Sequence, residues 1–185
     1  AETQSKLLAK RLAAEGQIVV VYNFPDNRSR ASYFATTDKL REYSSDKRIL
    51  EHYRALFYSF ERYDKQSDIS RQLMRSAIVI VTGYTASTMS TLAPEIDDEA
   101  QRRGFYLWLD NFEENGLKIT RPDLGILLGN STAEQLGKTK TLSEIKQLFP
   151  KNYHFIELES DSGEPLGIAH TNLKIWEKVR PLVTP

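Results

Sequence analysis

Short apolar runs that alternate with helical segments are the feature that most restricts the fold of this chain. The runs are Ile18–Tyr22, Ala77–Val81, Leu124–Leu128 and Tyr153–Leu158. The first two are continuous stretches rich in β-branched residues, as in strands that are covered on both faces. Strands separated by helices imply a parallel, doubly wound sheet. The sequence therefore predicts an α/β fold.

Between these runs, apolar residues recur at helical spacing. Ser45 or Asp46 is a suitable N-cap for one helix, and Gly16 and Gly116 are suitable stops for two others. We expect helices over Lys6–Glu15, from Asp46 to Tyr63, over Ser67–Ser76, over Ala93–Asn115, over Leu142–Phe149 and over His170–Val183.

Composition excludes several classes of protein. The 185 residues suffice for one domain with a substantial core. The 25 basic and 25 acidic residues balance, so no cationic signature indicates a nucleic-acid partner. The chain has no cysteine, which excludes disulfides and thiol catalysis. No apolar run approaches the roughly 20 residues that cross a bilayer. We expect an intracellular protein of the cytoplasm or of an organelle such as the mitochondrion, neither secreted nor inserted in a membrane.

The order of motifs in the first part of the chain carries a family resemblance. Thr3-Gln4 leads into the first helix, and Phe24-Pro25 follows the first strand. This order resembles the thymidylate kinase family, in which a phosphate-binding loop ending in Gly-Lys-Ser-Thr-Gln opens the helix and the next strand ends in Phe-Pro. The resemblance covers roughly Thr3 to Leu128. It implies a three-layer, P-loop kinase-like fold and a single domain over residues 1–185.

The segment Phe57–Tyr63 resembles the helix with which the family holds the nucleobase. There an aromatic ring stacks on thymine and an arginine contacts its carbonyl, and the residues here are Tyr58 and Arg62. They are four apart and so share one helix face. The competing interpretation is a core aromatic helix with a surface arginine. The resemblance completes this residual nucleoside pocket with Phe24, Arg28, Tyr84 and Ser87.

The residues that the family uses for phosphoryl transfer are replaced. Counting back without a gap from Phe24-Pro25 puts Ala1 at the loop lysine and Glu2 at the magnesium-binding hydroxyl. The family's Asp-Arg pair after the next strand reads Thr82-Gly83 here. Phosphoryl transfer depends on positioned positive charge, and these positions do not supply it.

The family's arginine-rich lid is also missing. The chain has no arginine between Arg121 and Arg180, and only Lys138 and Lys140 lie near the expected lid. The three histidines share no metal-ligand spacing, so we expect no metal site.

The resemblance also implies a central strand that precedes the first helix. The sequence has no such strand before Ala1. A parallel sheet without it would leave two rows of backbone hydrogen-bonding groups unpaired. We therefore expect the strand to lie upstream of residue 1, or to come from another segment or chain.

Together these features predict a catalytically inactive thymidylate-kinase-like domain that is a structural or regulatory subunit of a larger assembly, without a cofactor. Aromatic residues such as Tyr33, Phe34, Tyr43, Phe105, Tyr106 and Trp108 suit protein contacts or a core. We expect other protein subunits as partners, with a homodimer and a nucleoside monophosphate as further candidates. Two alternatives remain. One is a nucleoside monophosphate kinase that uses ATP and Mg²⁺ to phosphorylate dTMP, with its phosphate loop upstream. The other is a non-catalytic nucleotide sensor.

Overall fold

The strands form two separate parallel pairs in this computed structural model, which describes residues 1–26, 28–36, 38–129, 136–157 and 166–183. β1 (Val19–Asn23) pairs with β2 (Ile78–Thr82), and β3 (Gly125–Gly129) pairs with β4 (Tyr153–Glu157). All four predicted strands are confirmed, each within about one residue of its expected bounds. Within the described residues no hydrogen bond joins β2 to β3.

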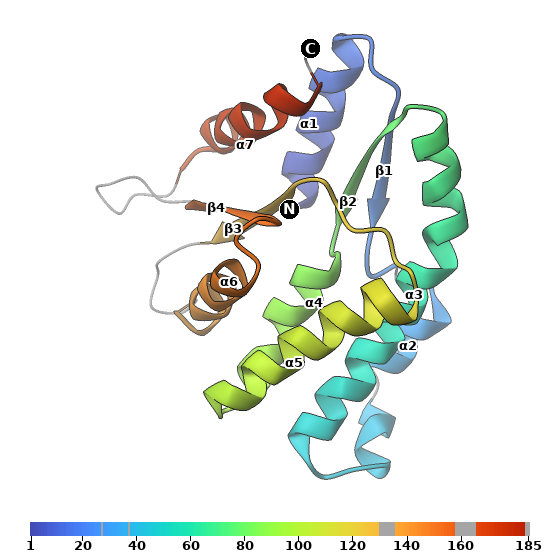
Figure 1. Cartoon of the computed structure of the whole chain (residues 1–185), viewed down its shortest axis with the longest axis vertical. Helices are drawn as coiled ribbons and strands as arrows, with labels where there is room; N and C mark the ends of the chain where they lie inside the picture. The colour runs from blue at the N-terminus through green and yellow to red at the C-terminus, as the bar shows by residue number, and fades with distance from the viewer. Residues whose placement is uncertain (27, 37, 130–135, 158–165, 184–185) are drawn as a thin grey trace.

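One helical layer nevertheless covers both pairs of strands. α1 (Glu2–Ala14) and α7 (Ile168–Val183) pack against each other beside the strands (Figure 1). Half-buried residues from β1, β2, the β3 segment and the end of α7 join the buried residues of the two helices and of β4 in one cluster. Its members are Leu8, Leu12, Ile156, Ile175, Trp176 and Val179, together with Val19, Ile78, Ile80, Leu124, Ile126, Leu128 and Val183. The two strand pairs therefore share one hydrophobic core.

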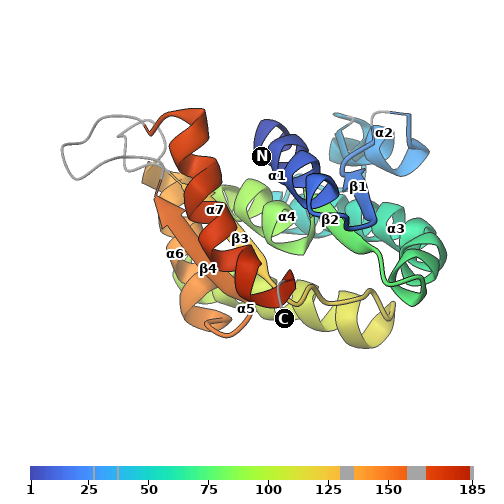
Figure 2. The same cartoon turned by 90° about the horizontal axis from the view of Figure 1, so that it is seen from above.

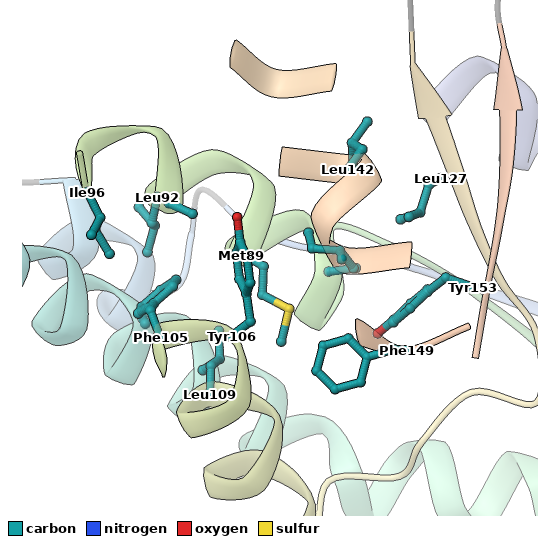
Figure 3. Close-up of a cluster of buried hydrophobic side chains, with 14 residues drawn as sticks. Met89, Leu92, Ile96, Phe105, Tyr106, Leu109, Leu127, Leu142, Phe149 and Tyr153 are labelled. Carbon is teal, nitrogen blue, oxygen red and sulfur yellow. The ribbon is translucent and has the colours of Figure 1, made fainter. Parts of the chain in front are cut away.

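The opposite layer consists of further helices that enclose a second core. α3 (Lys47–Met74), α4 (Thr85–Leu92), α5 (Glu99–Asn111) and α6 (Leu136–Leu148) make up this layer. Figure 3 shows its packed side chains: Met89, Leu92, Ile96, Phe105, Tyr106, Leu109, Leu127, Leu142, Phe149 and Tyr153. The two helical layers and the parallel strands confirm the predicted three-layer α/β architecture.

α3 is one continuous helix of 28 residues, so the prediction of two helices with a break after Tyr63 was wrong. Asp46 is its N-cap, accepting a hydrogen bond from the backbone N–H of Arg48 at 2.9 Å. No glycine or proline interrupts the helix, and Ile69 is buried in its second half. α3 also packs against β2, and because Ile69 is buried the helix continues through Ser67.

Other elements also differ from the prediction. α2 (Arg30–Thr36), the 3-10 turn η1 (Asp38–Glu42) and α4 were not predicted. The helix expected over Ala93–Asn115 divides into a 3-10 turn η2 (Ala93–Glu95), α5 and a π-helical turn η3 (Phe112–Gly116). The division occurs because Asp98 caps α5, accepting from the N–H of Gln101 at 2.8 Å. α6 begins before the expected Leu142. No helix in the described ranges is long and apolar enough to cross a membrane.

Candidate functional site

The candidate site lies at the carboxyl ends of β1 and β2. Open α/β folds bind their ligands at this end of the strands. The two strand ends are joined by hydrogen bonds. Thr82 Oγ1 donates to Asn23 Oδ1 at 2.6 Å, and the N–H of Phe24 donates to the carbonyl oxygen of Thr82 at 2.9 Å. The hydroxyl of Thr82, which the resemblance puts at the position of the family's aspartate, therefore joins the two strands.

The resemblance puts Gly83 at the position of the family's arginine, and the backbone at Gly83 excludes a side chain. Its φ angle is +73°, in the left-handed region that favours glycine. A Cβ atom built there would lie 1.7 Å from the carbonyl oxygen of Phe24. Because that neighbour is backbone, a larger residue would require the ends of β1 and β2 to separate. The local backbone conformation at Gly83 therefore leaves no room for an arginine side chain.

Arg62 is the most completely buried charged residue of the site, with 1% of its surface exposed. Its Nε donates to Glu113 Oε1 at 3.1 Å and Nη1 donates to Thr88 Oγ1 at 3.0 Å. Nη2 also pairs with Glu113. Every nitrogen of the guanidinium therefore has a partner inside the protein. The interpretation of Arg62 as a surface residue was wrong, and the guanidinium is directed to the core.

Glu113 gathers three elements around this ion pair. It lies in η3, is 2% exposed, and accepts hydrogen bonds from Ser59 Oγ and Thr85 Oγ1, each at 2.6 Å. Ser59 belongs to α3 and Thr85 begins α4. Buried charges require such partners because an unpaired charge is costly to desolvate. The network therefore joins α3, α4 and η3 into one closed polar cluster.

Tyr84 lies beside this cluster and belongs to a second set of hydrogen bonds. Its hydroxyl donates to the carbonyl oxygen of Thr120 at 2.8 Å and accepts from Gln66 Nε2 at 3.3 Å. Its ring centre lies 6.0 Å from the Arg62 guanidinium carbon and 6.3 Å from the ring centre of Phe24. Burial raises the pKa of Tyr84 to about 12, so its hydroxyl stays protonated at neutral pH.

Arg28 lies in the loop after β1 and pairs with a neighbour. Its Nε and Nη2 donate to the two carboxylate oxygens of Asp26 at 3.1 and 3.0 Å. These hydrogen bonds lower the pKa of Asp26 to about 2. Glu61 holds the same loop, accepting from the N–H of Asp26 and from Ser32 Oγ, each at 2.5 Å. The loop is therefore held to α3 by hydrogen bonds, and the charge of the exposed Arg28 is neutralised by Asp26.

The first turn of α1 carries a negative charge. Ala1 is the N-cap residue and provides no side-chain hydrogen bond. Glu2 forms an exposed ion pair with Lys6 at 2.7 Å, and this hydrogen bond lowers the pKa of Glu2. Helix N-termini attract anions. A carboxylate at this position opposes the approach of phosphate.

The structure thus brings together only part of the predicted pocket. Phe24, Arg62 and Tyr84 lie close to one another. Tyr58 is half-buried one turn before Arg62, packs against the second core, and has its pKa raised by burial. Ser87 is exposed on the first turn of α4.

The residues that the resemblance assigns to the phosphates of ATP do not fit that role. Glu2, Thr82 and Gly83 supply no positive charge, and Gly83 has no room for a side chain. Within the described residues, no group of three or more acidic or histidine side chains is placed to hold a metal ion. Residues 130–135 and the side chain of Lys138, in the expected lid, lie outside the described part; Lys140 is exposed on α6.

Sequence reasoning missed the residues that close the site: Glu113, Thr85, Thr88 and Gln66. No short motif contains them, because Glu113 is 51 positions from Arg62. The only available signal was a general one: an arginine that is buried needs a buried acidic residue as its partner.

Comparison with known proteins gives the family. A family model described as thymidylate kinase matches residues 2–157. The chain belongs to the thymidylate kinase family. A thymidylate kinase structure from Candida albicans is 18% identical, with a TM-score of 0.65 over 97% of this chain and 85% of the other. One from Ehrlichia chaffeensis is 18% identical, with a TM-score of 0.68 over 96% and 91%.

These similarities confirm the family resemblance and the fold. At such low identity the structural matches establish only the fold. Comparison of the sequence with curated proteins finds no significant match.

Proposed function

We propose that this thymidylate kinase family member is catalytically inactive and serves as a structural or regulatory subunit of a larger protein assembly. The burial of Arg62 carries the proposal. A base-binding arginine must offer hydrogen-bond donors to its ligand, but Arg62 is 1% exposed and each of its three nitrogens already donates to Glu113 or Thr88. A nucleobase would have to displace a buried carboxylate.

The phosphate side of the site supports the same proposal. Transfer of a phosphoryl group needs positive charge on its developing negative charge. Glu2 provides no positive charge and is paired with Lys6, and Gly83 contributes no charge. Arg28, the remaining cation of the predicted pocket, pairs with Asp26. The described residues therefore favour a protein that has kept the kinase fold but not the kinase activity.

Calorimetry with dTMP tests the proposal on the full-length natural protein. We expect no saturable heat of binding up to about 1 mM dTMP, a limit that corresponds to about −4 kcal/mol. Binding of dTMP to the natural protein that is lost in a Tyr58→Ala variant would contradict a purely structural role. It would favour the nucleotide sensor. Circular dichroism of that variant controls for its folding.

A further inference from the structure

β1 has one edge that no other described strand covers. The N–H of Ile78 donates to the carbonyl oxygen of Ile18, and the N–H of Phe24 donates to that of Thr82. Successive residues of a strand point to opposite edges, so the even-numbered residues along β1 direct their backbone groups to β2. The outward-facing residues are Val19, Val21 and Asn23. In the ranges that the structure describes, no backbone hydrogen bond reaches this outer edge.

The sequence of β1 does not protect this edge against pairing. Figure 2 shows β1 at the end of the row of strands farthest from β4. Natural proteins blunt free edges with proline, with charged side chains or with bulges. β1 reads Val-Val-Val-Tyr-Asn, without a proline or a charged residue, and Ile18 just before it is 61% exposed. An edge of this composition is expected to pair with another strand.

A groove of about 620 Å³ lies beside β1 and under α1. β1 lines it with Val21 and Asn23, whose backbone groups face the free edge, and α1 lines it with Thr3, Lys6 and Lys10. Alternate side chains of a strand point to the same face of a sheet. An extended segment laid along β1 would therefore direct every second side chain into this groove.

The charges around the groove indicate the chemistry of that segment. Lys6 already pairs with Glu2 at 2.7 Å. Asp68 contacts β1 from the other face of the sheet and pairs with Arg71 at 3.1 Å. Lys10 is exposed and has no ion pair among the described residues. A carboxylate on an added strand would supply the missing partner of Lys10.

A second copy of this chain fits the groove less well than an acidic segment of another protein. A second copy that joined edge to edge would present its own β1, and that strand contains no Asp or Glu. An acidic segment of about five residues would match both the open backbone groups and Lys10. At about 3.4 Å per residue, such a segment covers the full length of β1, about 17 Å.

We propose that the free edge of β1 binds an extended acidic segment of a different protein subunit. The segment adds a strand to the sheet and places an Asp or Glu side chain beside Lys10. In strand addition, backbone hydrogen bonds supply affinity and alternate side chains supply specificity. The inference rests on the proposed role as a subunit of an assembly, and it names the chemistry of the partner.

Zero-length crosslinking tests the predicted ion pair in the assembly, purified from the source cells through the full-length natural protein. A carbodiimide joins the amino group of Lys10 directly to a carboxylate that it touches, and mass spectrometry identifies the joined segment. Lys178 is the matched control, because it is exposed on α7 and does not line the groove. We expect Lys10 to join an Asp or Glu of another subunit, in a segment that Lys178 does not reach. No product of Lys10 with another subunit, or the same segment joined to both lysines, would overturn the inference.

Titration of the synthetic peptide of that segment tests the strand addition. Val21→Pro removes an N–H that faces the free edge, a position where an edge strand tolerates proline. The peptide should bind at least about tenfold more weakly to Val21→Pro and to Lys10→Glu, a loss of about 1.4 kcal/mol. Its affinity for Lys178→Glu should be unchanged. Circular dichroism controls for the folding of each variant, and unchanged affinity in both groove variants would contradict strand addition.

Amide hydrogen exchange of the unmodified protein tests the same contact without a substitution. On binding the peptide, the amides of Val19, Val21 and Asn23 should exchange at least about tenfold more slowly, whereas those of Val20 and Tyr22 should change little. Peptide binding that leaves the three outward amides unprotected would overturn this inference and leave the subunit role standing. A full-length protein that purifies without any partner would instead contradict the proposed function, so the two failures are distinguishable.

Discussion

Arg62 and Glu113 form a buried ion pair that fixes α3 to the π-helical turn η3. Ser59 and Thr85 complete the hydrogen bonding of the carboxylate. The pair occupies the place where the family resemblance puts recognition of a nucleobase. Its burial has consequences for stability that can be measured.

Replacing Glu113 by glutamine should strongly destabilise the protein. The change leaves the Arg62 charge buried without its counter-ion, which costs about 3–5 kcal/mol. Urea unfolding measures this loss. Glu114→Gln is the matched control, because Glu114 pairs with Arg121 at the surface, and its loss should stay below about 1 kcal/mol. Equal losses in the two variants would contradict the buried ion pair.

Replacing Gly83 by alanine should cost more than replacing Gly16. Both glycines have positive φ angles, +73° and +83°, and that conformation costs about 1–2 kcal/mol for other residues. Of the two, only Gly83 would bring the added Cβ against backbone, which should add about 1–3 kcal/mol. Thermal or urea unfolding compares the variants. A Gly83→Ala variant as stable as Gly16→Ala would show that the strand ends are not held together as described.

Alkaline pH should destabilise the protein through two partly buried tyrosines. Burial raises the pKa of Tyr84, and also that of Tyr22, to about 12, whereas unfolded tyrosine titrates near 10. The unfolded state therefore loses its protons first, and stability falls as the pH rises from about 10 to about 12. In Tyr84→Phe the slope should be shallower by up to about 1.4 kcal/mol per pH unit. An unchanged slope would contradict the burial of Tyr84.

The free edge of β2 should be visible by amide hydrogen exchange. The N–H of Ile78 donates to Ile18 in the direction of β1, and successive residues of a strand point to opposite edges. The amides of Val79 and Val81 therefore face away from β1. In residues 1–185 alone we expect them to exchange faster than those of Ile80 and Thr82.

We propose that a further strand upstream of residue 1 covers this edge of β2. Protection of Val79 and Val81 that appears only in a longer natural protein would support that strand. Equal protection of all four amides in residues 1–185 would count against it.

The sequence predicted β1 and β2 well because their runs of β-branched residues leave little choice of structure. β3 and β4 were predicted from short apolar runs between helical segments. It predicted that Tyr58 and Arg62 share a helix face, which follows from their spacing alone. It did not predict the continuity of α3, since Ser67 resembles a helix start unless the burial of Ile69 is known. The partner of Arg62 depends on contacts between distant segments, and periodicity carries no information about those.

The most direct test of the central claim is a coupled assay of the full-length natural protein with ATP, dTMP and Mg²⁺. We predict no ADP formation above the background without enzyme, because Arg62 is sequestered by Glu113 and no cation stands at Gly83. A turnover number near 1 per second, at the lower end of the kinase range of about 1–100 per second, would contradict the account.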